Sequence, residues 1–241
     1  MIRVENLNKS FDGQKILKDL NLAIPEGELW VVLGESGSGK SVFLQHLVGI
    51  LKPDSGRVLI DGESITGLSE KRLLAIRKQI GYLFQQGALY DFMTVFENVA
   101  FPLQEHTSLK PKEISKKVMA MLAMLGIQES FGKYPSELSG GMKKRCALAR
   151  SIILGTRILL CDEPTSGLDP IRSRNISDLI RNVTNRMKCT TLVASHDIAN
   201  SLRIADHLVL IHGGAIIARG SPDELAANDN GFVKEFLLSA Q

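Results

Sequence analysis

The stretch LWVVLGESGSGKS, residues 29–41, joins a short apolar run to a glycine-rich turn. An apolar, β-branched run that ends at a glycine is typical of a buried strand, and the following VFLQHLVGIL predicts a helix. The pattern G-x-x-x-x-G-K-[ST] is matched in full by Gly34, Gly39, Lys40 and Ser41. Because the pattern lies between a strand and a helix, it predicts a phosphate-binding loop rather than a chance glycine-rich turn.

This loop has the residue types that wrap phosphate groups. Its glycines allow backbone N–H groups to surround the phosphates, Lys40 reaches the β- and γ-phosphates, and the Ser41 hydroxyl ligates Mg²⁺. We therefore expect a nucleoside triphosphate with Mg²⁺ at this place. The expected nucleotide-binding residues are Gly34, Glu35, Ser36, Gly37, Ser38, Gly39, Lys40, Ser41 and Val42.

RILLCDEP, residues 157–164, carries two carboxylates to the end of another apolar run. Asp162 is suited to hold Mg²⁺ through the ligand shell of the metal, and Glu163 is suited to polarise the attacking water as general base. Taken alone, the pair is typical of a solvent-facing strand end. With the phosphate-binding loop upstream, the catalytic interpretation is the better one.

Two further polar side chains also follow apolar strands. His196 in SHD lies where an imidazole could contact γ-phosphate oxygens or position the water. Gln85 in LFQQ offers a neutral amide that could touch both the metal shell and a mobile neighbour. The ordinary alternatives are a structural hydrogen bond for His196 and a polar loop residue for Gln85, and spacing alone selects neither residue. Together with Glu163 and Lys40, they form the candidate catalytic set.

Short apolar runs alternate with helical patterns, which predicts an α/β fold with a mainly parallel sheet and helices on both faces. Ligands of such folds bind at the carboxyl ends of the strands, where these polar motifs lie. Residues 1–28 predict short strands and turns, and strand signals fade over residues 86–155, where apolar residues recur at helical spacing. We expect one domain, residues 1–241, with a nucleotide-binding core at 1–85 and 156–241 and an inserted helical subdomain at 86–155.

LSGGM, residues 138–142, is a second candidate for anion binding. Ser139, Gly140 and Gly141 precede the helix-forming run KKRCALAR, so small residues stand at a helix N-terminus, where free N–H groups attract anions. The basic residues that follow are Lys143, Lys144 and Arg145. They are interpreted as a solvated helix face, and contact with lipid headgroups is the weaker alternative.

The bulk composition excludes several classes of protein. The chain has 241 residues and a net charge of +3, which argues against a nucleic-acid partner because such partners need a concentrated basic face. Its three cysteines have no CxxC spacing, which is typical of inert thiols in a reduced compartment. No apolar run approaches the roughly 18 residues of a membrane span, so we expect a chain that does not cross a membrane itself.

Taken in order, these motifs resemble the ATP-binding-cassette (ABC) ATPases over essentially the whole chain. GESGSGKS is similar to Walker A, ILLCDEP to Walker B, LSGGM to the ABC signature, SGLD to the D-loop and SHD to the switch histidine. Gln85 resembles the Q-loop glutamine, and Phe11 resembles the aromatic residue that stacks on adenine. The resemblance implies a P-loop NTPase fold of the ABC type with an N-terminal antiparallel β region, with ATP and Mg²⁺ as cofactors and Ser41, Gln85 and Asp162 around the metal.

In that family two cassettes pair head to tail, and each signature helix points its N-terminus at ATP held by the other subunit. Ser139, Gly140 and Gly141 would therefore bind the γ-phosphate of the nucleotide on the partner, and Asp169 in the D-loop would help to align the two sites. Because the chain holds one cassette, the resemblance implies a homodimer.

A finer resemblance is to the Mla/MCE-type lipid-transport ATPases, also called the toluene-tolerance family. Met142 stands where most signatures carry glutamine, and the tracts FQQGALYDFMTVFENVAFPLQEHT and PSELSGGMKKRCALAR match that pattern. The resemblance implies ATP hydrolysis that powers phospholipid or other lipid transport at the cytoplasmic face of the inner membrane. The implied partners are a multi-span permease dimer, an MCE-domain lipid-binding protein and, in some systems, a STAS-domain protein. The aromatic and methionine side chains of residues 86–103 suit a groove for a permease helix.

Other functions stay open at this point. The cargo could be a polar amino acid or a metal, or the chain could be a lipoprotein-release ATPase. A soluble ABC machine for translation or DNA repair usually carries two cassettes or a long coiled coil, and neither is present. A degenerate cassette that only binds nucleotide is disfavoured by Glu163, His196 and Lys40.

Overall fold

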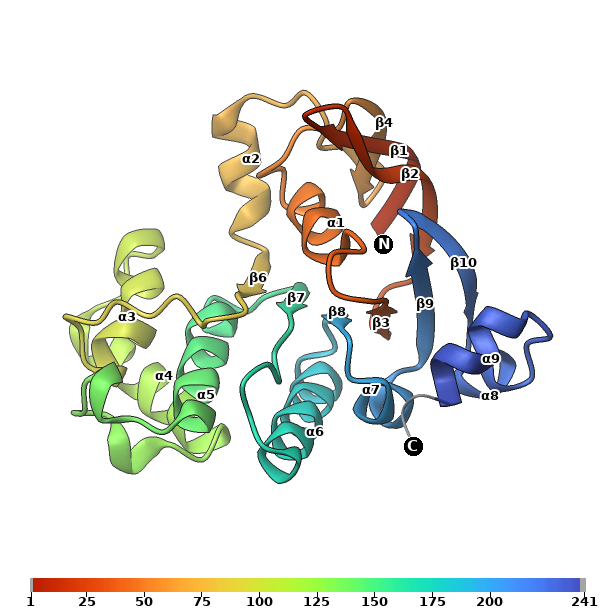
Figure 1. Ribbon diagram of the computed structural model, residues 1–241. Coiled ribbons are helices and arrows are strands. Elements are labelled where there is room, and N and C mark those ends of the chain that lie inside the picture. Colours follow the sequence, from red (N-terminus) through yellow and green to blue (C-terminus); the bar gives the residue numbers. More distant parts are fainter. Residues whose placement is uncertain (1, 239–241) are drawn as a thin grey trace.

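A central sheet of six strands, in the order β10-β9-β3-β8-β7-β6, runs through the protein (Figure 1). The computed structural model describes residues 2–238. The strands are β3 (Leu29–Leu33), β6 (Ile80–Leu83), β7 (Ile158–Asp162), β8 (Thr190–Ser195), β9 (His207–His212) and β10 (Ala215–Gly220). Neighbouring strands pair in parallel, except for the antiparallel hairpin of β9 and β10. The predicted mainly parallel core sheet is confirmed.

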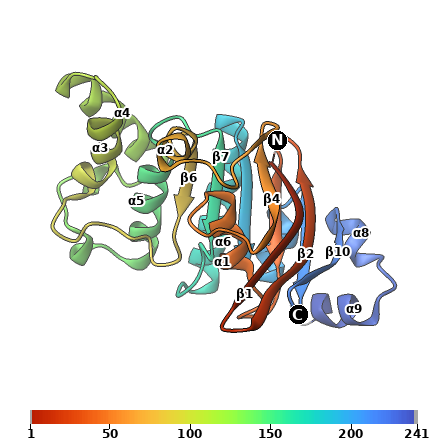
Figure 2. The same cartoon turned by 90° about the horizontal axis from the view of Figure 1, so that it is seen from above.

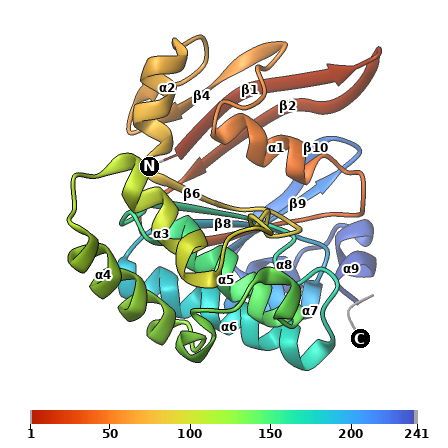
Figure 3. The ribbon, with the colours of Figure 1, turned by 90° about the vertical axis from the view of Figure 1, so that its left-hand side faces the viewer.

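A second, antiparallel sheet forms a separate layer (Figure 3). Its strands are β1 (Ile2–Phe11), β2 (Gln14–Ile24), β4 (Ser55–Ile60) and β5 (Glu63–Ser64). We expected short strands here, but β1 and β2 are 10 and 11 residues long. Asn6 and Asp19 take left-handed backbone conformations, and the pairing register shifts between Val4 and Leu7. These bulges interrupt the alternation of apolar and polar residues and hide the true strand length.

Alternate residues of β3 face two different cores. Leu29, Val31 and Leu33 belong to one apolar cluster, whereas Trp30 and Val32 belong to the other. The first cluster lies under α6 (Pro170–Met187) and α7 (Ile198–Ile204), and the second surrounds α1 (Lys40–Leu47), which lies between the two sheets (Figure 1). A strand that is buried on both faces must be apolar throughout, which is why LWVVL carries no polar residue.

The remaining helices lie at the two ends of the sheet (Figure 2). The chain between β6 and β7 forms α3 (Val95–His106), α4 (Pro111–Met124) and α5 (Gly140–Ile152), with short 3₁₀ turns at Gln128–Ser130 and Pro135–Glu137. Helix α2 (Glu70–Arg77) precedes β6, and α8 (Pro222–Ala226) and α9 (Gly231–Leu238) follow β10. The subdomain bounds at 86 and 155 stay a prediction. Within residues 2–238, no helix is long and apolar enough to span a membrane.

Strand order decides which motifs meet. Because β3, β8, β7 and β6 are parallel neighbours, their carboxyl ends lie along one edge of the sheet. The phosphate-binding loop follows β3, Glu163 follows β7, His196 follows β8, and Gln85 lies just beyond β6. The fold therefore gathers polar groups that are more than 150 positions apart along the chain.

Asn98, fully buried on α3, organises the loop that leads into that helix. Its Oδ1 accepts a hydrogen bond from Tyr90 N at 2.9 Å, and its Nδ2 donates to Met93 O at 3.0 Å. Nδ2 also lies 3.1 Å from Tyr90 O. This one amide therefore satisfies backbone groups that the loop cannot pair by itself.

Replacing Asn98 with Ala should lower the free energy of unfolding by about 3 kcal/mol, because Tyr90 N–H and Met93 C=O lose their partner and each costs about 1–3 kcal/mol. Urea denaturation measures the change. Gln104→Ala removes an exposed amide from the same helix and should change stability by less than about 0.5 kcal/mol. Equal stability of the two variants would refute the role of Asn98.

Candidate nucleotide-binding site

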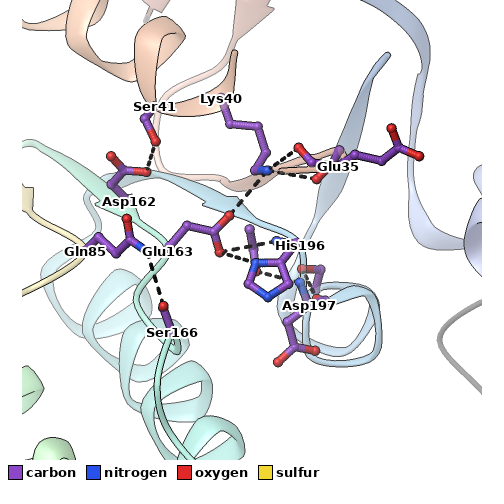
Figure 4. Close-up of polar contacts among 12 residues, drawn as sticks. Glu35, Lys40, Ser41, Gln85, Asp162, Glu163, Ser166, His196 and Asp197 are labelled. Atoms are coloured by element: carbon purple, nitrogen blue, oxygen red, sulfur yellow. Dashed lines mark hydrogen bonds and ion pairs between the residues drawn. The ribbon is translucent and has the colours of Figure 1, made fainter. Parts of the chain in front are cut away.

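A pocket of about 500 Å³ lies at the carboxyl edge of the parallel sheet. It is lined by Phe11, Ile16, Ser36, Gly37, Gly39, Lys40, Ser41, Val42, Gln85, Glu163 and His196. Apart from Ile16, these are residues that we selected from the sequence. Figure 4 shows how the polar side chains of the site converge from the phosphate-binding loop and from the ends of β6, β7 and β8.

The phosphate-binding loop is closed by its own lysine. Lys40 Nζ donates to Gly34 O at 2.8 Å and to Glu35 O at 3.0 Å, and it lies 3.3 Å from Glu163 Oε1 (Figure 4). Gly39, at φ +100°, has no room for a side chain, since a Cβ would lie 2.8 Å from Leu17 Cδ2. The loop is thus held tightly against β2 while its ammonium group faces the pocket.

Ser38 carries an unsatisfied hydrogen-bonding group inside the phosphate-binding loop. Its Oγ is buried and has no hydrogen-bond partner among the described residues. A Cβ on Gly34 would approach this oxygen to 2.6 Å, so the glycine leaves the space beside it open. A buried hydroxyl without a partner is costly unless a ligand supplies one. Ser38 does not line the pocket, whereas Gly37, Gly39, the Lys40 ammonium and the Ser41 hydroxyl do, and these donors fit a phosphate chain.

Asp162 lies next to Ser41 at the end of β7. Ser41 Oγ donates to Asp162 Oδ1 at 2.7 Å, and Tyr82 Oη donates to Oδ2 at 3.3 Å. Burial raises the pKa of Asp162, and the two hydroxyl donors oppose that shift. Burial and the neighbouring Asp162 also raise the pKa of Tyr82, which keeps the phenol a donor. A serine hydroxyl and a carboxylate side by side are the ligand types that Mg²⁺ accepts.

Glu163 is bracketed by two nitrogen donors. Its Oε1 pairs with Lys40, and its Oε2 lies 2.8 Å from His196 Nδ1. The side chain is buried, and the backbone has φ +45°, a left-handed conformation that is uncommon for residues other than glycine. Such strain persists where the surroundings impose it, and it is found most often at functional sites. The turn aims the Glu163 carboxylate into the pocket, while Asp162 points to Ser41 (Figure 4).

Gln85 reaches the pocket from the loop after β6. Its Nε2 donates to Ser166 Oγ at 3.2 Å, which joins it to the turn that follows Glu163 (Figure 4). The backbone carbonyl oxygen of Gln85 accepts a hydrogen bond from Lys144 Nζ on α5. Gln85 is therefore fixed at both its side chain and its backbone.

The signature residues and Asp169 do not join this pocket. Ser139 caps α5, where its Oγ accepts from Met142 N at 3.4 Å, and Gly140 and Gly141 form the first turn. Ser139 and Gly141 line a separate recess of about 140 Å³. Asp169 caps α6 and accepts from Arg172 N at 2.9 Å. Within one chain the predicted anion-binding segment Ser139–Gly141 therefore stands apart from the nucleotide pocket.

Sequence reasoning missed three residues of the site: Tyr82, Ser166 and Lys144. Tyr82 lies two positions before Phe84 on a strand whose motif we noted only for Gln85, and Ser166 was noted only as the start of SGLD. The interpretation of Lys144 was wrong, because the residue is 7% exposed and not part of a solvated face. Lys143 is exposed as expected. Only the direction in which α5 packs distinguishes these neighbours.

Comparisons with known proteins agree with this geometry. A family model described as ABC transporter matches residues 17–166. A probable ribonucleotide transport ATP-binding protein of Mycobacterium tuberculosis is 43% identical over 236 residues, which are 98% of this chain and 66% of the relative. The chain thus spans about two thirds of that mycobacterial protein. The intermembrane phospholipid transport system ATP-binding protein MlaF of Escherichia coli is 40% identical over 92% of this chain and 82% of its own length.

Solved structures show the same cassette. A dimeric ATP-binding cassette in a post-hydrolysis state, with ADP and Pi bound, superposes with a TM-score of 0.85 and is 30% identical, covering 92% of this chain and 99% of that one. CbiO1 from Clostridium perfringens, part of an ABC transporter complex, has a TM-score of 0.87 and is 34% identical over 98% of this chain and 94% of its own. Family model, relatives and structures agree, and this chain belongs to the ABC transporter family of ATP-binding cassettes.

Proposed function

We propose that this chain is the ATP-hydrolysing subunit of an ABC transporter that moves phospholipids or related lipids between membranes of the cell envelope. The observation that carries the hydrolytic part is the placement of Glu163 between Lys40 and His196 at the mouth of a phosphate-binding loop. The cargo is supported by the 40% identity to the phospholipid transport protein MlaF of Escherichia coli.

ATP is the ligand that fits the pocket from end to end. The loop and the N-terminus of α1 offer backbone N–H groups to the phosphates, and the Ser41 hydroxyl lines the same pocket. Lys40 would exchange its loop carbonyls for phosphate oxygens. At the far end, Phe11 is 42% exposed and lines the same pocket, so its ring is available to stack on adenine.

The residues beside the phosphates fit Mg²⁺. Ser41 Oγ, an Asp162 oxygen and the Gln85 amide oxygen are the groups that would hold the ion and its waters, and when bound it neutralises charge on the phosphates. Glu163 would accept the proton of the attacking water, and Lys40 would stabilise the charge that develops on the phosphoryl oxygens. His196 keeps the Glu163 carboxylate aimed at the pocket.

A head-to-tail homodimer would account for the separation between the phosphate-binding loop and the proposed anion-binding segment Ser139–Gly141. Each Ser139–Gly141 segment would then cover the nucleotide in the pocket of the partner, where small residues permit close approach. Asp169 at the N-terminus of α6 would lie at the same junction. The dimeric cassette with ADP and Pi, at 30% identity, supports this arrangement.

A groove beside β6 suits a helix of a membrane-spanning permease. It measures about 940 Å³ and lies between α2 and the α3–α5 region. Its apolar lining includes Leu74, Phe84, Tyr90 and Phe101, and its charged lining residues are basic, among them Lys71, Lys78 and Arg150. Val95 and Val99, which also lie within residues 86–103, are buried in the core instead. An amphipathic permease helix with acidic residues would complement this groove.

The further partners follow from the lipid-transport proposal. We include a permease dimer, an MCE-domain lipid-binding protein and a STAS-domain protein, with the chain bound peripherally at the cytoplasmic face of the inner membrane. A polar cargo is the alternative, since the mycobacterial relative at 43% identity is named a probable ribonucleotide transport protein.

The complex can be isolated through a variant that does not turn over. Tagged Glu163→Gln protein is purified from detergent-solubilised membranes, and the proteins and lipids that purify with it are identified by mass spectrometry. A permease with an MCE protein and bound phospholipid supports the proposal. A polar-solute-binding protein would replace the cargo, and ribosomes or repair factors without a membrane protein would refute a transport role.

Glu163→Gln should reduce ATP turnover at least about 100-fold, because general-base catalysis contributes about 10²–10⁴-fold. ATP should still bind, and size-exclusion chromatography with ATP should show a trapped dimer. Phosphate release measures turnover. Glu105→Gln removes an exposed carboxylate on α3 and serves as the matched control. Wild-type turnover of the Glu163 variant would remove this residue from the role of base.

Phe11→Ala should raise the Kd for ATP about 10-fold, because stacking of a base on an aromatic ring contributes about 1–3 kcal/mol. Phe11→Trp should keep the wild-type affinity. Fluorescence titration with a labelled ATP analogue measures both. Equal affinities of the Ala and Trp variants would place the adenine elsewhere.

Leu74→Asp should release the chain from its membrane partner, because it puts a charge into the apolar lining of the groove. Ile50→Asp is the control, since Ile50 is 52% exposed, Leu74 is 51% exposed, and only Leu74 lines the groove. The amount of tagged chain that sediments with membranes is compared for the two variants. Equal sedimentation would exclude the groove as the docking site.

A further inference from the structure

Two cations on α5 hold the loop that carries Gln85, residues 84–90. Lys144 Nζ donates to Gln85 O, and Arg150 Nη2 donates to Gly87 O at 2.9 Å. Between them, a Cβ on Gly87 would lie 3.2 Å from Ala147 Cβ, so the backbone lies directly on the helix. One face of α5, formed by Lys144, Ala147 and Arg150, thus contacts the 84–90 loop along its backbone.

The Lys144 ammonium uses its side-chain hydrogen bond for the Gln85 backbone oxygen. The residue is buried, and no carboxylate lies within salt-bridge distance of Nζ in the part of the chain that the structure describes. Burial lowers the pKa of Lys144, whereas Cys161, Asp162 and Glu163 oppose the shift. A buried cation needs compensation, and the only side-chain hydrogen bond of Lys144 among the described residues is the one to Gln85 O.

Its neighbours in the sequence do different things. Lys143 points into solvent, and Arg145 Nη1 donates to Leu125 O at 2.7 Å, inside the helical region. Arg150 also stacks on Tyr90, with its guanidinium carbon 5.4 Å from the ring centroid, and so anchors the far end of the 84–90 loop. Of the three basic residues at 143–145, Lys144 is thus the one that contacts Gln85, which lines the pocket.

We propose that Lys144 is a positioning residue that ties the signature helix to Gln85. Ser139 stands at the N-terminus of α5, five positions before Lys144, and Gln85 lines the pocket of the same chain. A shift of α5 toward a nucleotide on the partner subunit moves Lys144 as well. Through its hydrogen bond, Lys144 then displaces the backbone carbonyl of Gln85. The amide of Gln85 then moves relative to Ser166 and the catalytic carboxylates. This inference rests on the proposed hydrolysis and head-to-tail dimer.

Turnover of the full-length protein tests the tie through Lys144→Met, which keeps the apolar stem and removes the donor. We expect kcat to fall about 10-fold, as for loss of one charge-assisted hydrogen bond. KM for ATP should stay within about 2-fold, since Lys40 and the phosphate loop are untouched. Lys144→Arg should restore most of the rate, and Lys143→Met, one position away in solvent, should match wild type. Unchanged kcat in Lys144→Met would overturn the proposal.

A double-mutant cycle separates positioning from a general loss of packing. In a Gln85→Ala background, Lys144→Met should cause no further loss, because the amide that Lys144 positions is gone. A loss that multiplies with that of Gln85→Ala would show that Lys144 acts by another route and would refute the inference. If Lys144→Met does not fold, Lys144→Leu, which also lacks a donor, takes its place with the same expectations.

Hydrogen exchange supplies a readout that needs no hydrolysis. In the nucleotide-free protein, the peptide that covers residues 84–90 should exchange several-fold faster in Lys144→Met than in wild type, and Lys143→Met should match wild type. Equal exchange in all three would overturn the tie. Should wild-type protein fail to hydrolyse ATP, the proposed function is wrong, and the exchange experiment still decides whether Lys144 holds the 84–90 loop.

Discussion

The ammonium group of Lys40 is the interaction on which the site depends. It is 5% exposed and lies within hydrogen-bonding or ion-pairing distance of oxygens from Gly34, Glu35 and Glu163. These oxygens come from the loop after β3 and the turn after β7, two strands that are separated by β8 in the sheet. A buried charge without such partners would be strongly unfavourable. One lysine therefore closes the phosphate loop and aligns the Glu163 carboxylate with it.

The parallel sheet makes this arrangement possible. The parallel pairing places Leu33 beside Ser195 and Asp162 beside Ala194, so the residue after each strand has a fixed position. Asp162 ends β7 and turns to Ser41, whereas Glu163, one position later, turns to His196. Two adjacent carboxylates thus receive different neighbours, and only one of them is held by nitrogen donors. The proposed division of labour, with Asp162 as metal ligand and Glu163 as base, is consistent with that difference.

Much of this could be predicted, because each motif follows a strand and parallel strand ends meet. Lys40, Ser41 and Glu163 were selected in that way, whereas Gln85 and His196 needed the family resemblance, and all five line one pocket. The lengths of some strands and the remaining side chains of the site depend on backbone conformation and packing, which a sequence pattern does not show. The length of β1 and β2 is hidden by left-handed residues such as Asn6. Tyr82 and Lys144 reach the site because of the direction in which β6 and α5 face, which only packing decides.

The left-handed backbone at Glu163 has a consequence for the history of such cassettes. At φ +45° the chain holds a carboxylate where glycine or asparagine would be less strained. Under the proposed role of Glu163 as base, selection for water activation keeps the glutamate against the energetic cost of this backbone conformation. A lineage freed from hydrolysis would gain stability by exchanging it. Glycine or asparagine after the Walker B aspartate of a related cassette would therefore record the loss of its chemistry, even where the phosphate loop is intact.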